Sequence, residues 1–148
     1  GTYSPAAINT GYPIQFNQTY LNNSVNVVGG TKITVDIGGV YNFQYTGQVL
    51  SSNTSAKTIY LWIRRNNIDI GYSTRAETVA INGGYTGINF SFDIDLAVGE
   101  YVELVAAVTD TGLKLDAVAA TSPHPGIPSS VMSVNFIAPL PDPRPTPP

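Results

Sequence analysis

The longest run of two-residue alternation in the first half of the chain lies between Gly38 and Leu50. The residues of one parity are mostly aromatic or aliphatic, and those of the other are uncharged and polar. Because successive side chains of a strand point to opposite faces, this pattern predicts a strand with one face in a core and one face towards solvent. An antiparallel sheet fits such a strand best. The predicted core face consists of Tyr41, Phe43, Tyr45, Gly47 and Val49.

A second alternating segment, from Ile88 to Leu96, places Phe90 and Phe92 on its apolar face. Asn66 and Asn67 are typical of a tight hairpin turn, because asparagine tolerates positive φ. No stretch of the sequence has a sustained helical period, and many short strands need their edges hidden. We therefore predict an all-β fold, an antiparallel jelly-roll β-sandwich of about 8–10 strands. The predicted core includes Phe43, Phe90, Phe92 and Leu104.

The 148 residues provide enough chain for one domain with a substantial core. Residues 1–11 are small and polar, so they are predicted to form an N-terminal arm, and residues 12–138 the jelly-roll domain. Residues 139–148 contain six prolines and are expected to run as a stiff polyproline II tail reaching about 30 Å. This tail is predicted either to dock on a neighbouring subunit or to serve as a solvated spacer.

Composition excludes several classes of function. Charged residues make up 11% of the chain and the formal net charge is −3, so there is no basic footprint for nucleic acid. The chain has no cysteine, which excludes disulfides, thiolate metal sites and cysteine nucleophiles. Its apolar runs are shorter than the roughly twenty residues that a membrane-spanning helix needs. We expect neither nucleic-acid binding nor membrane insertion.

Three short segments occur in the order found in one known family. Gly39 to Phe43 reads Gly-Val-Tyr-Asn-Phe at the start of the long strand, Ile14 to Asn17 lies upstream, and Ser130 to Ile137 forms a closing strand before Leu140. Over residues 12 to 140 the chain thus resembles the C1q/TNF-like jelly-roll domains. The resemblance implies a homotrimer. Low charge and loops rich in Asn, Thr and Gly look most like the versions in bacteriophage virions, as fibre tips, head fibres or capsid-decorating knobs.

The segment from Thr58 to Arg65 is bulky on both faces, with aliphatic residues on one and Tyr60 and Trp62 on the other. A lone sandwich covers only one face of a strand, so we expect another subunit to cover the second. The candidate aromatic contacts between subunits are Tyr41, Tyr45, Tyr60, Trp62 and Tyr101. Trp62, Arg64 and Arg65 are also candidates for binding a sugar or a carboxylate, with a solvated hairpin shoulder as the alternative.

Calcium binding and histidine catalysis are the two kinds of chemistry that the polar residues suggest. Asp93 and Asp95 share a strand face and are weak candidates for a Ca²⁺ site, together with Asp36, Asp110 or Asp116. The favoured alternative is that acidic residues on a solvent-facing strand prevent edge pairing, so no cofactor is predicted. The single histidine, His124, lies between two prolines without an evident base, nucleophile or further ligand, so no enzyme is predicted.

The sequence thus favours a non-enzymatic structural or attachment module of a virion, acting in host-surface recognition or particle reinforcement. Its expected partners are further copies of itself, other virion proteins through residues 139–148, and a host-surface glycan or protein. The alternative is a carbohydrate-binding module of a secreted bacterial adhesin or enzyme. Oligomeric state separates the two hypotheses.

Overall fold

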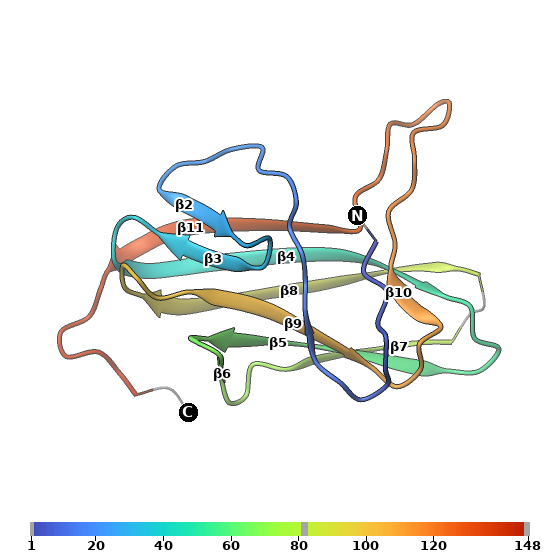
Figure 1. Cartoon of the computed structure of the whole chain (residues 1–148), viewed down its shortest axis with the longest axis horizontal. Helices are drawn as coiled ribbons and strands as arrows, with labels where there is room; N and C mark the ends of the chain where they lie inside the picture. Colours follow the sequence, from blue (N-terminus) through green and yellow to red (C-terminus); the bar gives the residue numbers. More distant parts are fainter. Residues whose placement is uncertain (1, 81–82, 147–148) are drawn as a thin grey trace.

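The strand β4 (Gly39–Ser51) is the centre of a four-stranded antiparallel sheet in a computed structural model that describes residues 2–80 and 83–146 (Figure 1). On one side β4 pairs along its length with β8 (Tyr85–Leu96). On the other side it pairs with β11 (Ser130–Pro139) and, at its end, with β10 (Leu113–Leu115). The alternation seen in the sequence is therefore that of a central strand.

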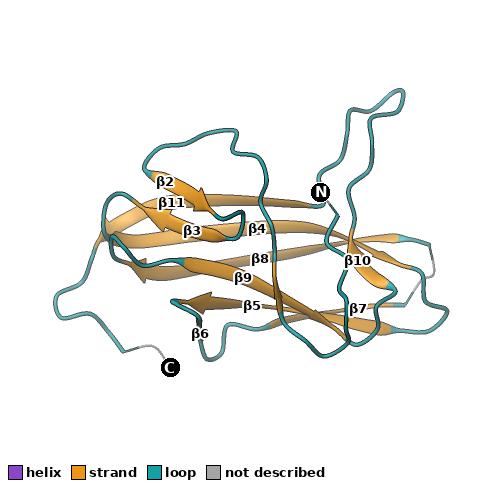
Figure 2. Ribbon diagram, in the orientation of Figure 1, coloured by secondary structure: helices purple, strands orange, loops and turns teal. Residues whose placement is uncertain are grey.

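The second sheet has seven strands built around β9 (Val102–Val108). One side of β9 pairs with β5 (Lys57–Arg65), which in turn pairs with β6 (Ile68–Asp69) and β7 (Arg75–Val79). The other side pairs with β1 (Tyr12–Pro13) and β3 (Lys32–Val35), and β2 (Val25–Val28) lies beyond β3. Figure 2 shows that strands and loops account for the whole described chain.

The core lies between the two sheets. The ring of Phe43 on β4 is fully buried and stacks on Phe92 of β8, with centroids 4.8 Å apart and planes 7° from parallel. Phe43, Phe90 and Leu104 are buried as predicted, whereas Phe92 lies on the predicted face but is only partly buried. The prediction of an all-β antiparallel sandwich is confirmed.

The turn between β5 and β6 has the predicted geometry. Asn66 and Asn67 both have positive φ, at 50° and 64°. Two successive residues with positive φ match the right-handed twist of a two-residue hairpin, so β5 and β6 fold directly back on each other.

The N-terminal segment crosses β9 and β5, in front of them in Figure 1. Tyr3 exchanges backbone hydrogen bonds with Leu115 of β10, and its hydroxyl donates to the carbonyl of Ala106 on β9. Gly11 lies directly over the ring of Trp62, because a Cβ there would be 2.8 Å from its Cζ2. This segment therefore joins β10 of the four-stranded sheet to β9 of the seven-stranded sheet, and it covers part of the outer face of the seven-stranded one.

The C-terminal tail does not extend away from the domain as the sequence suggested. After β11 the chain turns back beneath the sandwich (Figure 1), and Arg144 bonds to Asp95 at the end of β8 and to Glu100 in the turn between β8 and β9. The tail stays against the domain because its arginine pairs with the carboxylates of Asp95 and Glu100.

Within residues 2–80 and 83–146 there is no helix of the length and apolarity that crossing a membrane requires.

Candidate functional surfaces

The outer face of the four-stranded sheet carries mostly uncharged polar side chains and, apart from the tail near Val40, has no covering layer among the described residues. It is formed by the even-numbered residues of β4, which point away from the core, and by the residues of β8 and β11 that pair with them. Residues paired in register share a face of the sheet. We call this surface the amide face. Its main members are Asn42, Gln44, Thr46, Gln48, Asn89, Ser91, Val131, Ser133 and Asn135.

Hydrogen bonds between neighbouring strands order the amide face. The amide of Asn42 donates to Asp93 across the β4–β8 pair at 2.7 Å, and the hydroxyl of Thr46 donates to Asn89 at 3.1 Å. Side chains held in this way lose less conformational freedom when a partner docks on them.

β11 borders the amide face with apolar residues. Val131 and Ile137 are each about half exposed, although they belong to an ordered ten-residue strand. Phe136 is also half exposed, but it lies on the core-facing side of β11, where its ring packs on Tyr41. β11 is also the last strand of its sheet, so one of its edges faces outward. An apolar edge strand of this length is usually covered in a native protein.

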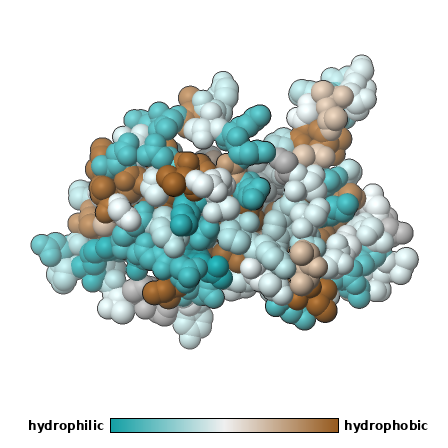
Figure 3. Space-filling model, in the orientation of Figure 1, coloured by the Kyte–Doolittle hydropathy of each residue, from teal (hydrophilic) through white to brown (hydrophobic). Residues whose placement is uncertain are grey.

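The outer face of the seven-stranded sheet is different, because the chain covers much of it. All seven residues of β9 are buried, including the outward-facing Val105. A Cβ on Gly11 would lie 3.0 Å from Val105, so the N-terminal segment is in contact with it. Figure 3 looks onto this covered side, where hydrophilic residues predominate and apolar ones are scattered.

Two of the five aromatic residues predicted to contact another subunit are in the chain's own core. Tyr41 and Tyr45 are both 2% exposed, on the inward face of β4. Their hydroxyls are bonded within the chain, that of Tyr41 to the carbonyl of Ile37 and that of Tyr45 to Ser130. The prediction is corrected for these two, because a tyrosine whose hydroxyl has a hydrogen-bond partner can occupy a core position.

The other three predicted aromatics lie nearer the surface. Tyr60 is 38% exposed, and Tyr101 is partly buried with the ammonium of Lys32 4.5 Å from its ring centroid. Trp62 is partly buried beneath Gly11. The expected cover of Trp62 exists, but the chain's own N-terminal segment supplies it.

The predicted binding group of Trp62, Arg64 and Arg65 is engaged within the chain. The indole of Trp62 and the guanidinium of Arg64 both donate to Asp69, at 2.8 and 3.0 Å. These hydrogen bonds, from Trp62 first and Arg64 second, lower the pKa of Asp69. Arg65 is ion-paired with Asp95 at 2.9 Å. Neither an open indole face nor an unpaired guanidinium is presented to a ligand.

The acidic residues considered for Ca²⁺ do not converge. Within the described residues, no three His, Asp or Glu side chains form a group that could hold a metal ion. Asp36 accepts from Asn26, Asp93 from Asn42, Asp110 from the Gly112 amide, and Asp116 from Thr2. The arrangement that the structure does give Asp95 is an ion-pair cluster.

This cluster joins the tail to the sandwich. Asp95 binds Arg65 through Oδ1, and through Oδ2 it accepts from Nε of Arg144 at 2.8 Å. Nη2 of Arg144 also donates to Oε1 of Glu100 at 2.9 Å. Burial raises the pKa of both carboxyl groups, but hydrogen bonds and the nearby guanidinium charges outweigh it, so both pKa values lie below the usual range. The sequence analysis missed Arg144 and Glu100, and the only signal was a single cation in a run of prolines.

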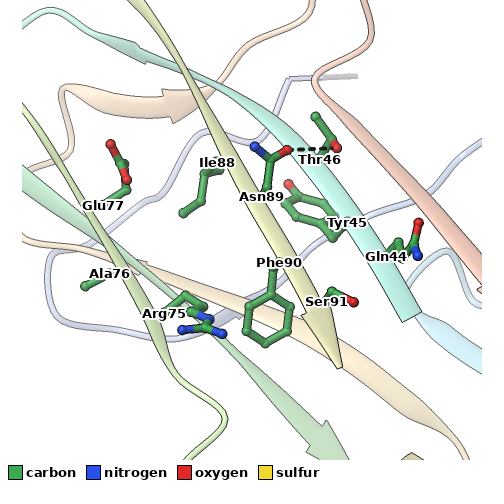
Figure 4. Close-up of a pocket in the computed structure, with 10 residues that line it drawn as sticks. All are labelled: Gln44, Tyr45, Thr46, Arg75, Ala76, Glu77, Ile88, Asn89, Phe90 and Ser91. Atoms are coloured by element: carbon green, nitrogen blue, oxygen red, sulfur yellow. Dashed lines mark hydrogen bonds between the residues drawn. The ribbon is translucent and has the colours of Figure 1, made fainter. Parts of the chain in front are cut away.

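An open cleft of about 550 Å³ lies where β7 borders β8. Figure 4 shows Arg75 and Glu77 on β7, with Ile88 and Phe90 of β8 facing them. Gln44, Thr46 and Asn89 extend the lining onto the amide face. The cleft therefore combines amide, hydroxyl, carboxylate and guanidinium groups with an apolar floor.

The loop before β11, drawn in orange, projects from the sandwich (Figure 1), and His124 within it is exposed. It exchanges backbone hydrogen bonds with Thr121, and its Nδ1 is 2.8 Å from the carbonyl oxygen of Pro125.

Neither a scan against protein-family models nor a search of curated proteins found a match to this chain.

Proposed function

We propose that this chain is a non-enzymatic structural or attachment module that assembles as a homotrimer, with the amide face and the apolar border of β11 between the subunits. The observation that carries the proposal is the difference between the two outer faces. The chain covers much of the outer face of one sheet with its own N-terminal segment, and it leaves that of the other open.

The chemistry of the open face suits contact with another protein surface. Amides and hydroxyls cost less to remove from water than charged groups, and they find new partners across an interface. Val131 and Ile137 add apolar area at the border. Burying these two half-exposed side chains against a second copy is favourable by roughly 25 cal/mol per Å² of apolar surface.

The connectivity supports a C1q/TNF-like jelly roll. The chain crosses repeatedly from one sheet to the other. It runs from β3 to β4, from β4 to β5, from β7 to β8 and from β8 to β9, and each of these steps joins strands of different sheets. Antiparallel pairing throughout is typical of such double-sheet folds. Together with the segments quoted above, this favours the trimeric assembly that the resemblance implies.

Within this proposal the module belongs to a bacteriophage virion, as a fibre tip, head fibre or capsid decoration. It would act in host-surface recognition or particle reinforcement. The resemblance and the weakly charged surface support this assignment, because a surface with few charges is suited to permanent contacts with neighbouring subunits.

Light scattering of the purified chain at micromolar concentration tests the assembly. The expected particle contains three chains of 15.7 kDa. Val131→Lys places a charge in the proposed interface and should give monomers. Ile68→Lys is the matched control, because Ile68 is also an exposed strand residue but lies on β6, away from the amide face. Monomeric wild-type protein would overturn the proposal.

The cleft at the β7–β8 border favours a second candidate, a carbohydrate-binding module. Sugar hydroxyls need side chains that donate and accept hydrogen bonds, and Arg75, Glu77 and Asn89 supply both. The binding surface would then be this cleft rather than Trp62. A monomer that binds glycans, and loses binding in Glu77→Gln, would favour this candidate over the trimer.

A further inference from the structure

The ion-pair cluster formed by the ends of β5 and β8 and the turn between β8 and β9 has the properties of a preformed receptor for one side chain. We call it the tail seat and define it by Arg65, Asp95 and Glu100. Its acceptors are held by the domain as well as by the tail. Asp95 is fixed by Arg65, which is only 12% exposed, and Glu100 accepts from the Ala97 amide at 2.8 Å and from Asn66 at 3.0 Å.

The charge of the tail seat calls for a cation. Arg65 supplies one positive charge against the two carboxylates of Asp95 and Glu100, so a single guanidinium from outside completes the balance. Arg144 donates through both Nε and Nη2, towards two different carboxylates. This geometry uses the planar fork of arginine, which the single ammonium of lysine does not reproduce.

A small cavity lies beside the charges, between the domain and the tail residues on either side of Arg144. A cavity of about 280 Å³ is lined by Val40, Ile70 and Ile94 of the domain and by Pro141 and Pro145 of the tail. Proline side chains are apolar, and their fixed φ lowers the conformational entropy lost on docking. The site thus recognises an arginine that has prolines on both sides.

We propose that the tail seat is a binding site for an arginine in a proline-rich segment, and that the tail of a second copy of this chain fills it as the chain's own tail does. The contacts made by an exchanged tail are identical, as in other exchanges of equivalent elements between protomers. Leu140 lies near Gly38, so this residue stays with its own domain. Only the residues beyond Leu140 need to move for the tail to reach a second copy.

The chain's own tail has the advantage in a free monomer, because a short tether gives it a local concentration in the millimolar range. A second copy's tail competes once the copies are held close together. The binding site itself does not depend on the proposed trimer, so the two proposals are tested separately.

The test uses the full-length Arg144→Ala chain, whose own tail lacks the guanidinium, and a fluorescent synthetic peptide with the sequence of residues 139–148. Fluorescence anisotropy should show binding of the wild-type peptide that weakens as salt is added. A peptide with alanine in place of the arginine should bind at least about tenfold more weakly, because both charge-assisted hydrogen bonds are lost. A peptide with lysine there should also bind more weakly.

The matched control is the full-length chain carrying both Arg144→Ala and Glu100→Gln, which should lose most of the affinity for the wild-type peptide. Equal binding of the wild-type and alanine peptides, or no binding to a folded Arg144→Ala chain, would overturn the proposal. If Arg144→Ala does not fold, the same peptide is titrated into wild-type protein. Displacement of the chain's own tail is then read from the NMR signal of the Arg144 Nε–H group, and no displacement at millimolar peptide also overturns the proposal.

Discussion

Nη2 of Arg144 lies 2.7 Å from Oδ2 of Asp95, which ties the proline-rich tail to an edge strand of the sandwich. The pair is partly buried, since the side chain of Asp95 is 14% exposed and that of Arg144 is 31% exposed. An ion pair shielded to this extent is screened less by salt than one on the open surface. The charge of Arg144 in the tail therefore helps to balance the carboxylates of Asp95 and Glu100 in the domain.

This cluster predicts that stability decreases in acid. The pKa values of Asp95 and Glu100 lie below their ordinary values of 3.8 and 4.5, which we assign to the unfolded chain. The folded state is thus favoured by these groups above about pH 5, and the contribution is lost as the pH falls through 4.5 and 3.8 towards the lowered values. Urea unfolding between pH 7 and pH 3 measures it. Arg144→Ala should reduce the pH dependence between pH 5 and 3, and an unchanged dependence would contradict the assignment.

Removing the ring of Phe43 should be the more costly of two aromatic substitutions in the core. Phe43→Ala is expected to lower the free energy of unfolding by about 3–5 kcal/mol, because a fully buried ring is lost and a cavity is left. Phe92→Ala is the matched control. Its ring is the other member of the same stacked pair but is partly exposed, so the cost should be smaller. Chemical denaturation of both variants checks the order, and equal losses would speak against the burial difference.

Gly47 is predicted to be intolerant of any side chain. A Cβ there would lie 2.6 Å from the hydroxyl oxygen of Tyr45, which itself bonds to Ser130. Gly47→Ala should therefore displace a buried ring and cost about 1–3 kcal/mol. Gly87→Ala on the paired strand β8 is the control, because a Cβ at Gly87 meets nothing within 4 Å. Thermal unfolding should separate the two variants clearly.

The single tryptophan reports on the N-terminal segment. Gly11→Leu adds a side chain where even a Cβ would be 2.8 Å from the Trp62 ring, so the segment should lift away from β5. The emission of Trp62 is then expected to shift to longer wavelength, and quenching by acrylamide should increase. Gly29→Leu would not serve as a control because Gly29 has positive φ, whereas Gly87→Leu has open space and should leave the emission unchanged.

Side-chain periodicity allowed much of the strand structure to be predicted. The alternation from Tyr41 to Val49 and from Ile88 to Leu96 identified two strands and their core faces, because the pleat of a strand fixes which residues share a face. Asn66 and Asn67 gave the hairpin turn for a similarly local reason.

The surfaces were harder to predict, because periodicity shows that a face is apolar without showing what covers it. Tyr41 and Tyr45 share the parity of Phe43, so the pattern already placed them in the core, and the prediction of an interface role gave too much weight to their aromatic character. The cover of Trp62 comes from Gly11, a residue without a side chain to signal the contact. The partners of Arg144 are more than forty residues away in sequence, where local patterns carry no information.

The N-terminal segment also sets the order in which this fold can be completed. Tyr3 bonds to Ala106, 103 positions later in the chain, and Thr2 bonds to Asp116, 114 positions later. During synthesis Thr2 and Tyr3 lack these partners until most of the domain has left the ribosome. Contacts of such large sequence separation are slow to form, because the entropy of closing the loop is lost before the contact stabilises it. Residues 2 and 3 are thus made well before their partners and are among the last of this domain to be fixed, and until then β9 and Trp62 are open to other chains emerging nearby.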